Sequence, residues 1–199
     1  MKTILKVTSS ARGAYSNSNQ LANEIVARLQ QNNPGATVIE RNLVSQKYPH
    51  LEESHLAAFF APPENDTPQT RTAASHSDEA ITELEKADSI VIGVPIYNFN
   101  IPSALKAWID HIVRARKTFS YASGSPEGLL KGKKVYLAIA SGGVYSDGPM
   151  KSLDFAEPYL KAVLGFIGLS DITVFRVEGV NIPGVQETAL EKGLASVAV

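Results

Sequence analysis

The sequence predicts an α/β fold in which helices cover both faces of a five-stranded parallel sheet. Three observations lead to this prediction. Short apolar segments alternate along the chain with longer segments of helical periodicity. Two of the short segments, Ser89–Val94 and Lys134–Ala140, are apolar at nearly every position, as expected of central strands covered on both sides. Regular alternation of strands and helices favours parallel strands joined by right-handed crossovers.

The N-terminal half is expected to form two strands and two helices. The first strand is Thr3–Thr8 and the second is Thr37–Leu43. Between them lies a helix whose apolar residues recur at helical spacing, namely Leu21, Ala22, Ile25, Val26 and Leu29. Residues Val44–Ser75 are expected to form one long irregular loop. Ser77 is then predicted to cap the second helix.

The C-terminal half is expected to supply three more strands and three more helices. The predicted segments are Ser89–Val94 (strand), a helix that begins near Pro102, a loop over Arg116–Lys131, Lys134–Ala140 (strand), Phe155–Ile167 (helix), Ile172–Val177 (strand) and Gly184–Val197 (helix). Five such units favour a doubly wound sheet with the flavodoxin-like strand order 2-1-3-4-5. Ligands bind such sheets at the carboxyl ends of the strands, where the winding reverses. The loops after strands 1, 3 and 4 should therefore carry the site.

The composition limits the class of protein. The chain has 199 residues, of which 44% are apolar and 20% charged, as expected of one globular domain over residues 1–199. A net charge of −1 lacks the basic surplus of a nucleic-acid-binding protein. No run reaches the ~18 apolar residues of a membrane span, and the N-terminus does not read as a signal peptide, so a cytoplasmic protein is expected. Cysteine is absent, which excludes disulfides and thiolate chemistry.

The histidines give no metal site. His50 and His55 are separated by a spacing that fits no standard metal-binding motif. His111 is expected on the surface or at an interface. Trp108 and part of the apolar stretch Ala162–Leu169 are explained about equally well by packing in the core and by contact with a second subunit.

The loop after the first strand, TSSARGAYSNSNQ, concentrates hydroxyl groups where the first helix begins. A helix N-terminus presents unpaired N–H groups and a partial positive charge. Together with the hydroxyls of Ser9, Ser10, Ser16 and Ser18, it can hold a phosphate monoester without a lysine. The alternative is that Ser16 or Ser18 is only an N-cap. Neither GxGxxG nor GxxxxGKS/T is present, so the two commonest nucleotide-binding loops are excluded.

The loop after the third strand lies within VIGVPIYNFNIPSALKAWIDHI and carries two aromatic residues and two amides. Main-chain donors at the end of a strand suit the polar edge of a planar heterocycle, and Tyr97 and Phe99 suit its faces. Asn98 can both donate and accept a hydrogen bond. The alternative is that both aromatics are core residues. Asn100 is expected to cap the following helix, because Pro102 stands at a first-turn position.

The loop after the fourth strand, ASGGVYSDGP, begins with Ser141, Gly142 and Gly143. Paired glycines let the backbone approach a ligand closely and leave N–H groups free. A lone SGG is better explained as a plain turn, so this assignment depends on the place of the loop beside the other two.

Taken together, these segments resemble the FMN-dependent NADH-azoreductases, which are also NADH:quinone oxidoreductases. The matching segments are SS…YSNSNQL at Ser9–Leu21, PIYNFNIPSALKAWID, TFSY…PEGLLKGKK, and DGP with YLKAVLGFIGL. They occur in this order, at matching spacing, over nearly the whole length. The resemblance implies a flavodoxin-like fold, FMN bound without covalent attachment, and a homodimer with the active site at the subunit interface.

The resemblance also assigns site residues. The implied cofactor-binding residues are Ser10, Ser16, Asn17 and Ser18 for the phosphate, and Ile96, Tyr97, Asn98, Phe99, Ser141, Gly142 and Gly143 along the flavin. The family often has methionine where Ile96 stands, and it typically reads Ser-Arg-Gly-Gly where this chain has Ala140-Ser141-Gly142-Gly143. The implied substrate pocket contains Phe119, Tyr121 and Tyr145.

The implied activity is hydride transfer in two steps, in which NADH reduces FMN and a quinone or azo compound then accepts two electrons at the same place. Sharing one place predicts ping-pong kinetics, and because the cofactor carries the chemistry, no acid–base residue is required. Two alternatives of other classes are a flavodoxin-type electron carrier without its own substrate turnover, and a binding module without flavin. The near-neutral charge and the long loops argue against the carrier. No residue is identified that would select NADH over NADPH.

Overall fold

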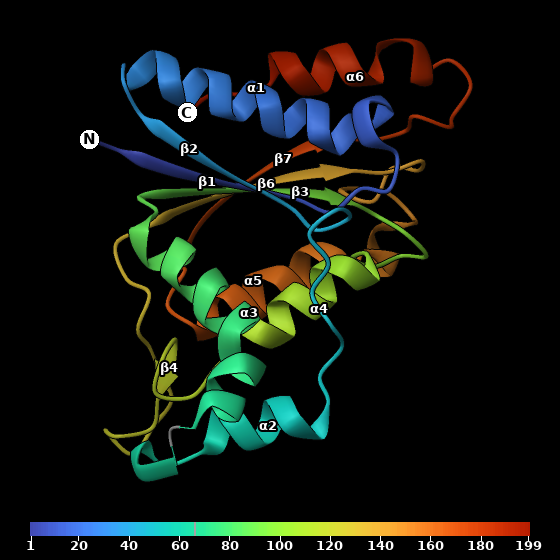
Figure 1. The fold of residues 1–199 in the computed structure, drawn as a ribbon. Coiled ribbons are helices and arrows are strands. Elements are labelled where there is room, and N and C mark those ends of the chain that lie inside the picture. The colour runs from blue at the N-terminus through green and yellow to red at the C-terminus, as the bar shows by residue number, and fades with distance from the viewer. Residues whose placement is uncertain (66) are drawn as a thin grey trace.

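A computed structural model describes residues 1–65 and 67–199 (Figure 1). The strands are β1 (Thr3–Thr8), β2 (Thr37–Asn42), β3 (Ser89–Pro95), β4 (Phe119–Ser120), β5 (Glu127–Gly128), β6 (Lys134–Ala140) and β7 (Asp171–Val177). The α-helices are α1 (Asn17–Asn32), α2 (Glu53–Phe60), α3 (Pro68–Lys86), α4 (Ser103–Ile112), α5 (Ala156–Phe166) and α6 (Gln186–Ala195). Short 3-10 helices span Gly13–Tyr15, Pro63–Asn65 and Lys151–Leu153.

The main sheet has five parallel strands in the order β2-β1-β3-β6-β7. This is the predicted order 2-1-3-4-5, which is confirmed. The register aligns one apolar row across all five strands, formed by Ile39, Leu5, Ile90, Val135 and Ile172. The chain winds in opposite directions on either side of β1 and β3, so the loops after these two strands meet at one edge of the sheet.

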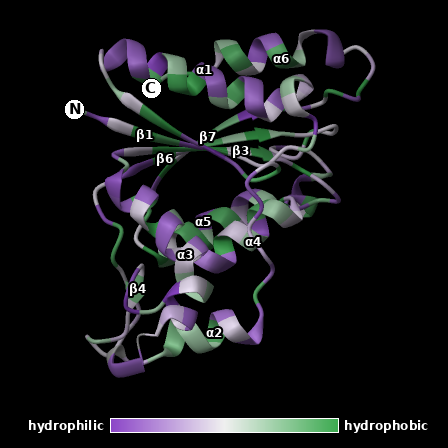
Figure 2. Cartoon of the chain, viewed as in Figure 1, coloured by the Kyte–Doolittle hydropathy of each residue, from purple (hydrophilic) through white to green (hydrophobic). Residues whose placement is uncertain are grey.

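The sheet lies between two layers of helices. Figure 1 shows α1 and α6 on one side of the sheet and α3, α4 and α5 on the other. Alternate residues of β3 serve the two layers, since Ile90 and Ile92 join the core with Trp108, whereas Val91 joins the core with Leu21. The apolar colour of the strands between these layers is visible in Figure 2. Among the described residues, no helix has the length and apolar character needed to cross a membrane.

The segment Val44–Ser75, predicted as one loop, instead contains α2 and the first part of α3; residue 66 lies outside the described residues. Thr67 caps α3 in a capping box with Thr70, and Pro68 occupies the first turn. The apolar pattern is weak here because α2 and the start of α3 pack on each other partly through small residues such as Ala58 and Ala74.

Ser77 is therefore not an N-cap, and its predicted role is wrong. It lies buried inside α3, where its hydroxyl donates to the carbonyl oxygen of His111 over 2.7 Å.

Asn100 is also not a cap. Pro102 is the N-cap residue of α4, and the Oδ1 atom of Asn100 accepts a hydrogen bond from the N–H of Ile101 instead. The remaining predicted elements differ from the structure mainly at their ends, and the loop Arg116–Lys131 contains the short β4–β5 hairpin.

Two residues considered for a subunit interface belong to the core. Trp108 is 1% exposed and packs among the residues between the sheet and α3, α4 and α5. His111, predicted on the surface or at an interface, is fully buried. Of the stretch Ala162–Leu169, Leu164, Ile167 and Leu169 are buried in the same core, and Val163 and Phe166 pack against it while half-buried.

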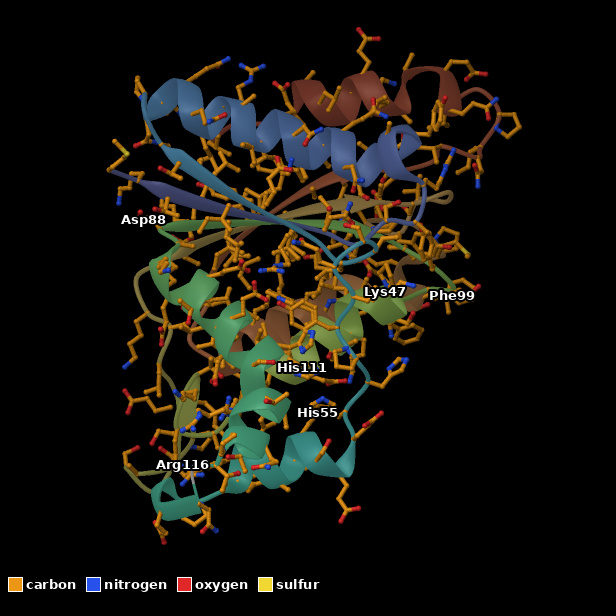
Figure 3. The ribbon with its side chains drawn as sticks, in the orientation of Figure 1. Lys47, His55, Asp88, Phe99, His111 and Arg116 are labelled. Atoms are coloured by element: carbon orange, nitrogen blue, oxygen red, sulfur yellow. The ribbon has the colours of Figure 1, made fainter. Side chains whose placement is uncertain are left out.

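His111 anchors the segment after β2 to α4. Its Nε2 atom donates to the carbonyl oxygen of Pro49 over 3.0 Å, because a carbonyl oxygen can only accept. Four rings surround the imidazole with centroid distances of 5.2 to 6.3 Å, those of Tyr48, His55, Phe59 and His76. Figure 3 shows His111 and His55 near each other. The Nδ1 atom of His111 has no hydrogen-bond partner among the described residues.

We predict that acid destabilises the fold through His111. Burial is the largest effect and lowers the pKa of His111; the nearby His55 and His76 act in the same direction, whereas the hydrogen bond to Pro49 and the charge of Asp110 oppose them. The unfolded chain binds this proton near the ordinary value of about 6.5, so below that pH the unfolded state carries the extra proton and stability falls as pH falls. A tenfold difference in proton affinity between the two states corresponds to about 1.4 kcal/mol.

The measurement is thermal unfolding between pH 7.5 and 5. The control is His111→Gln, whose amide can still donate to Pro49 but cannot titrate, and it should flatten the pH dependence. If this variant keeps the dependence of the native chain, other groups cause it.

Candidate functional site

A cavity of about 200 Å³ lies at the carboxyl ends of the central strands. Its lining comes from the loops after β1, β3, β6 and β7. The lining residues are Ser10, Arg12, Ser16, Asn17, Ser18, Pro95, Ile96, Tyr97, Ala140, Ser141, Gly142, Val180 and Asn181. All predicted cofactor-binding residues are in this list except Asn98, Phe99 and Gly143, which lie next to it in the chain. The three loops chosen from the sequence therefore meet in space.

The first loop supplies unpaired hydrogen-bond donors. Ser16 is the N-cap of α1, and its Oγ atom accepts from the N–H of Asn19 over 3.2 Å. The same Oγ atom lies 3.0 Å from the Oγ atom of Ser18. The N–H groups of Asn17 and Ser18 have no acceptor among the residues that the structure describes. Ser16 is thus both a cap and a cavity residue, so the two interpretations of this loop are compatible.

The charges around this cavity favour an anion. Arg12 lines it, and its side chain makes no ion pair with the described part of the chain. Among the described residues, no aspartate, glutamate or histidine lines it. Hydroxyls, free N–H groups and a guanidinium at the N-terminus of a 16-residue helix form a donor set that suits a phosphate monoester.

The second loop is a tight turn with unusual backbone angles. The N–H of Tyr97 donates to the carbonyl oxygen of Asn100 over 2.9 Å, and the N–H of Asn100 donates back to Tyr97 over 3.1 Å. Asn98 and Phe99 between them have φ angles of 50° and 70°. Such left-handed angles cost about 1–3 kcal/mol at a residue other than glycine, and they cluster at functional sites.

This turn presents both donors and rings. The N–H groups of Asn98 and Phe99 have no acceptor within residues 1–65 and 67–199. The hydroxyl of Tyr97 lies 3.3 Å from the Oγ atom of Ser10, which ties the turn to the first loop. Tyr97 and Phe99 are 36% and 42% exposed, so neither is a core aromatic. Free N–H groups beside exposed rings suit a planar heterocycle with a polar edge.

The third loop approaches the loop after β7 closely. A Cβ atom on Gly142 would lie only 2.6 Å from the Nδ2 atom of Asn181, so a larger residue requires a shift. The hydroxyl of Ser141 donates to the carbonyl oxygen of Gly143 over 2.8 Å. The loop is therefore held by this hydroxyl where the resembling family typically has an arginine. The N–H groups of Gly142 and Gly143 have no acceptor among the described residues.

Val180 and Asn181 were missed by the sequence analysis, which considered only the loops after strands 1, 3 and 4. They follow the edge strand β7, in EGVNIPG. The sequence does carry a signal for this fourth loop. Asn181 follows Gly179 soon after the end of a predicted strand, and the loops after parallel strands lie at the same edge of the sheet.

Tyr145, predicted in the substrate pocket, lies beside Phe99. The two rings are edge to face with centroids 6.3 Å apart. The N–H of Tyr145 donates to Glu178 over 2.8 Å, and the N–H of Phe155 donates to the carbonyl oxygen of Phe99 over 3.2 Å. Figure 3 places Phe99 at the edge of the molecule where the strands end. Tyr145 and Phe99 together form an aromatic flank next to the cavity.

Arg176 holds the loop that carries Tyr145. Its guanidinium pairs with Asp154, Glu157 and Glu178, and Glu178 in turn accepts from the backbone of Tyr145. Burial acts to lower the pKa of Arg176, but hydrogen bonds to Glu157 and Asp154 outweigh it and raise the pKa overall. Because charge-assisted pairs in a partly buried place are directional, this group fixes the aromatic flank.

Phe119 and Tyr121, also predicted in the substrate pocket, do not reach this cavity within one chain. Phe119 belongs to β4 and packs on Phe166 at the C-terminal end of α5, with a centroid distance of 4.7 Å. Figure 1 shows β4 well away from the ends of the strands that form the cavity. The physical reason is that α5 begins at the cavity edge and runs back across the sheet.

The histidines do not form a metal centre. His55 closes the capping box of α2, where its Nδ1 atom accepts from the N–H of Glu52 over 3.0 Å. In the described part of the chain, no group of three or more His, Cys, Asp or Glu residues could hold a metal ion.

Comparison with known proteins identifies the class. A family model described as flavodoxin-like fold matches residues 2–198. An FMN-dependent NADH:quinone oxidoreductase of Herminiimonas arsenicoxydans is 49% identical over 180 residues, which are 90% of this chain and 88% of that protein. FMN-dependent NADH:quinone oxidoreductase 6 of Burkholderia lata is 46% identical over 199 residues, 100% of this chain and 99% of that protein.

Solved structures agree. The crystal structure of azoreductase from Bacillus anthracis str. Sterne has a TM-score of 0.89 and 31% identity, covering 98% of this chain and 96% of that one. An FMN-dependent NADH-azoreductase from Bacillus anthracis str. Ames Ancestor in complex with FMN has a TM-score of 0.85 and 26% identity, covering 98% and 95%. The fold and the site define a flavodoxin-like protein. The chain belongs to the flavodoxin-like family that contains the FMN-dependent NADH:quinone oxidoreductases.

We predict that the turn at Asn98 limits stability. Asn98→Gly should raise the free energy of unfolding by up to about 1 kcal/mol, because glycine adopts a positive φ without strain. Asn98→Val should lower it by about 2 kcal/mol or more, because a branched Cβ disfavours that angle. Urea unfolding of the two variants measures the difference, and equal stabilities would show that the turn is not strained.

Proposed function

We propose that this chain is an FMN-dependent oxidoreductase that uses NADH to reduce quinones and azo compounds. The observation that carries the proposal is the meeting of two donor sets at one cavity, where the first set lines the cavity and the second lies partly in its lining and partly next to it in the chain. Hydroxyls and free N–H groups stand at the start of α1, and further free N–H groups stand on the Tyr97–Asn100 turn and the Gly142–Gly143 loop. The related proteins are named for the same cofactor, donor and acceptors.

The donor set fits FMN. The hydroxyls of Ser16 and Ser18, with the N–H of Asn17, would hold the phosphate, and Arg12 would add a positive charge. The backbone of Asn98, Phe99 and Gly143 would meet the polar edge of the ring, while Ile96 gives an apolar flank. When bound, FMN supplies a ring that takes a hydride from NADH and passes two electrons to an acceptor. The residues of this chain bind and orient, and none of those lining the cavity is an acid–base group of the Asp, Glu or His type.

We also propose a homodimer with the site at the subunit interface. Leu56 and Phe60, one helical turn apart on α2, are 44% and 69% exposed. Tyr121 and Leu129 of the β4–β5 hairpin region are 60% and 41% exposed. An interface over these residues would bury them and would bring Phe119 and Tyr121 toward the cavity of the partner subunit. The proposed location is the cytoplasm, which the cysteine-free sequence suits.

The function is tested on the purified protein. Its visible spectrum should show bound flavin, and NADH added without air should bleach the flavin bands. Initial rates with a quinone at several fixed NADH concentrations should give parallel double-reciprocal lines. Colourless protein that does not take up added FMN would contradict the proposal.

The phosphate role of the first loop predicts a charge effect at Ser16. Ser16→Asp keeps a good N-cap but places a negative charge beside the phosphate, so the Kd for FMN should rise about 100-fold. Ser16→Asn keeps a cap without the charge and should raise the Kd less than about tenfold. Fluorescence titration of FMN measures both, with circular dichroism to check folding. Equal Kd values for the two variants would place the phosphate elsewhere.

The dimer proposal predicts an effect of charge on α2. Phe60→Glu should shift the protein toward monomer in light scattering at micromolar concentration, because a charge cannot be buried without a partner. Ala27→Glu adds the same charge on the exposed side of α1 and should leave the mass unchanged. A native protein that is already monomeric under these conditions would contradict the dimer.

A further inference from the structure

A second cavity of about 330 Å³ adjoins the first. Tyr97 is a lining residue of both cavities. The second cavity lies between the loop after β1, the segment after β2 and the start of α4. Much of its lining is apolar, with side chains of Leu43, Val44, Pro102 and Ala107 among them. Nothing in the proposed binding of FMN uses this space.

Lys47, an exposed residue, places a positive charge at the second cavity. Lys47 and His50 line it, and neither makes an ion pair or a side-chain hydrogen bond with any residue that the structure describes. No aspartate or glutamate lines it. Tyr48, another lining residue, remains a neutral phenol because burial raises the pKa of Tyr48 to about 12. Figure 3 shows Lys47 on the segment after β2, on the same side of the molecule as Phe99.

The start of α4 adds free donors to the same wall. Pro102 and Ser103 line the cavity, and Pro102 caps the helix without any side-chain hydrogen bond. The N–H groups of Ser103 and Ala104 have no acceptor among residues 1–65 and 67–199. A helix N-terminus favours negative charge, and here it acts on the same space as the unpaired ammonium group of Lys47 and the unpaired imidazole of His50.

We infer that this second cavity is a subsite for the anionic substituent of an aromatic acceptor, such as a carboxylated or sulfonated arene. The inference rests on the proposed function and names the class of acceptor. Apolar walls accept the arene, and Lys47, His50 and the α4 N-terminus receive its negative group. Tyr97 lines both cavities, so an acceptor whose reducible group lies in the first cavity extends its charged substituent into the second. Lys47 determines specificity for charged over neutral acceptors.

The test compares an azobenzene carboxylate with its methyl ester, which differ in charge but share one skeleton. In the FMN-loaded enzyme with saturating NADH, Lys47→Ala should raise the ratio of the KM for the carboxylate to the KM for the ester about fivefold, and Lys47→Glu should raise it further. Lys47→Arg should keep the native ratio. Lys192→Ala, which removes a lysine from α6, is the matched control and should also keep it.

Binding without turnover gives a second readout. The oxidised FMN-loaded enzyme is titrated calorimetrically with the carboxylate in the absence of NADH. The Kd of the native protein for the carboxylate should rise with salt concentration. At one salt concentration, the Kd of Lys47→Ala should be about fivefold higher than that of the native protein.

Two outcomes would overturn the inference. One is a ratio that does not change in either Lys47→Ala or Lys47→Glu. The other is a rise in the KM for NADH in Lys47→Ala that equals the rise in the KM for the carboxylate, which would assign the cavity to the diphosphate of NADH. Turnover of the neutral ester by native enzyme reports the proposed function separately, so failure of the subsite and failure of the function can be told apart.

Discussion

The site depends on backbone N–H groups that the fold leaves without partners at one edge of the sheet. Parallel strands end at the same edge, and the segments that follow β1, β3 and β6 each carry N–H groups without an acceptor in the described chain. These are the N–H groups of Asn17, Ser18, Asn98, Phe99, Gly142 and Gly143. Unpaired donors in a sheltered place favour a ligand that can accept from them. In the proposed complex with FMN, the phosphate would accept from the N–H groups at α1, and the edge of the ring would accept from those of the Tyr97–Asn100 turn. Side chains such as Ser16 and Arg12 refine this arrangement, which the winding of the chain creates.

Two polar side chains, the half-buried Arg176 and the buried His111, hold segments next to the site in place. Arg176 joins three carboxylates and through Glu178 holds the backbone of Tyr145. His111 holds the carbonyl of Pro49 and so fixes the segment that carries Lys47 and His50. Neither residue lines either of the two cavities described above, yet each holds a segment that lies next to one of them. Loops with few apolar contacts need such hydrogen bonds and ion pairs, because hydrophobic burial has no preferred direction and does not fix the orientation of polar side chains.

Much of the fold was predictable because apolar periodicity reports burial directly. The strands Ser89–Pro95 and Lys134–Ala140 are buried on both sides, and their sequences are apolar at nearly every position. The segment around α2 was not predicted, because there a helix packs on the start of another helix through small residues, and the signal lies in caps such as Thr67-Pro68. The three site loops could be identified, since winding order decides which loops meet. The prediction that His111 lies at the surface or an interface was wrong, because the sequence does not show whether a helical histidine faces water or packs against other rings.

The contact between Gly142 and Asn181 links two loops that are almost forty positions apart in the chain. A Cβ atom at residue 142 would occupy the space of the amide at residue 181, so the identities of these positions constrain each other. A relative that carries a side chain at the first position should carry a smaller residue at the second. Exchange of either loop alone between relatives is therefore expected to create a steric conflict, whereas exchange of both together preserves the shape of the cleft.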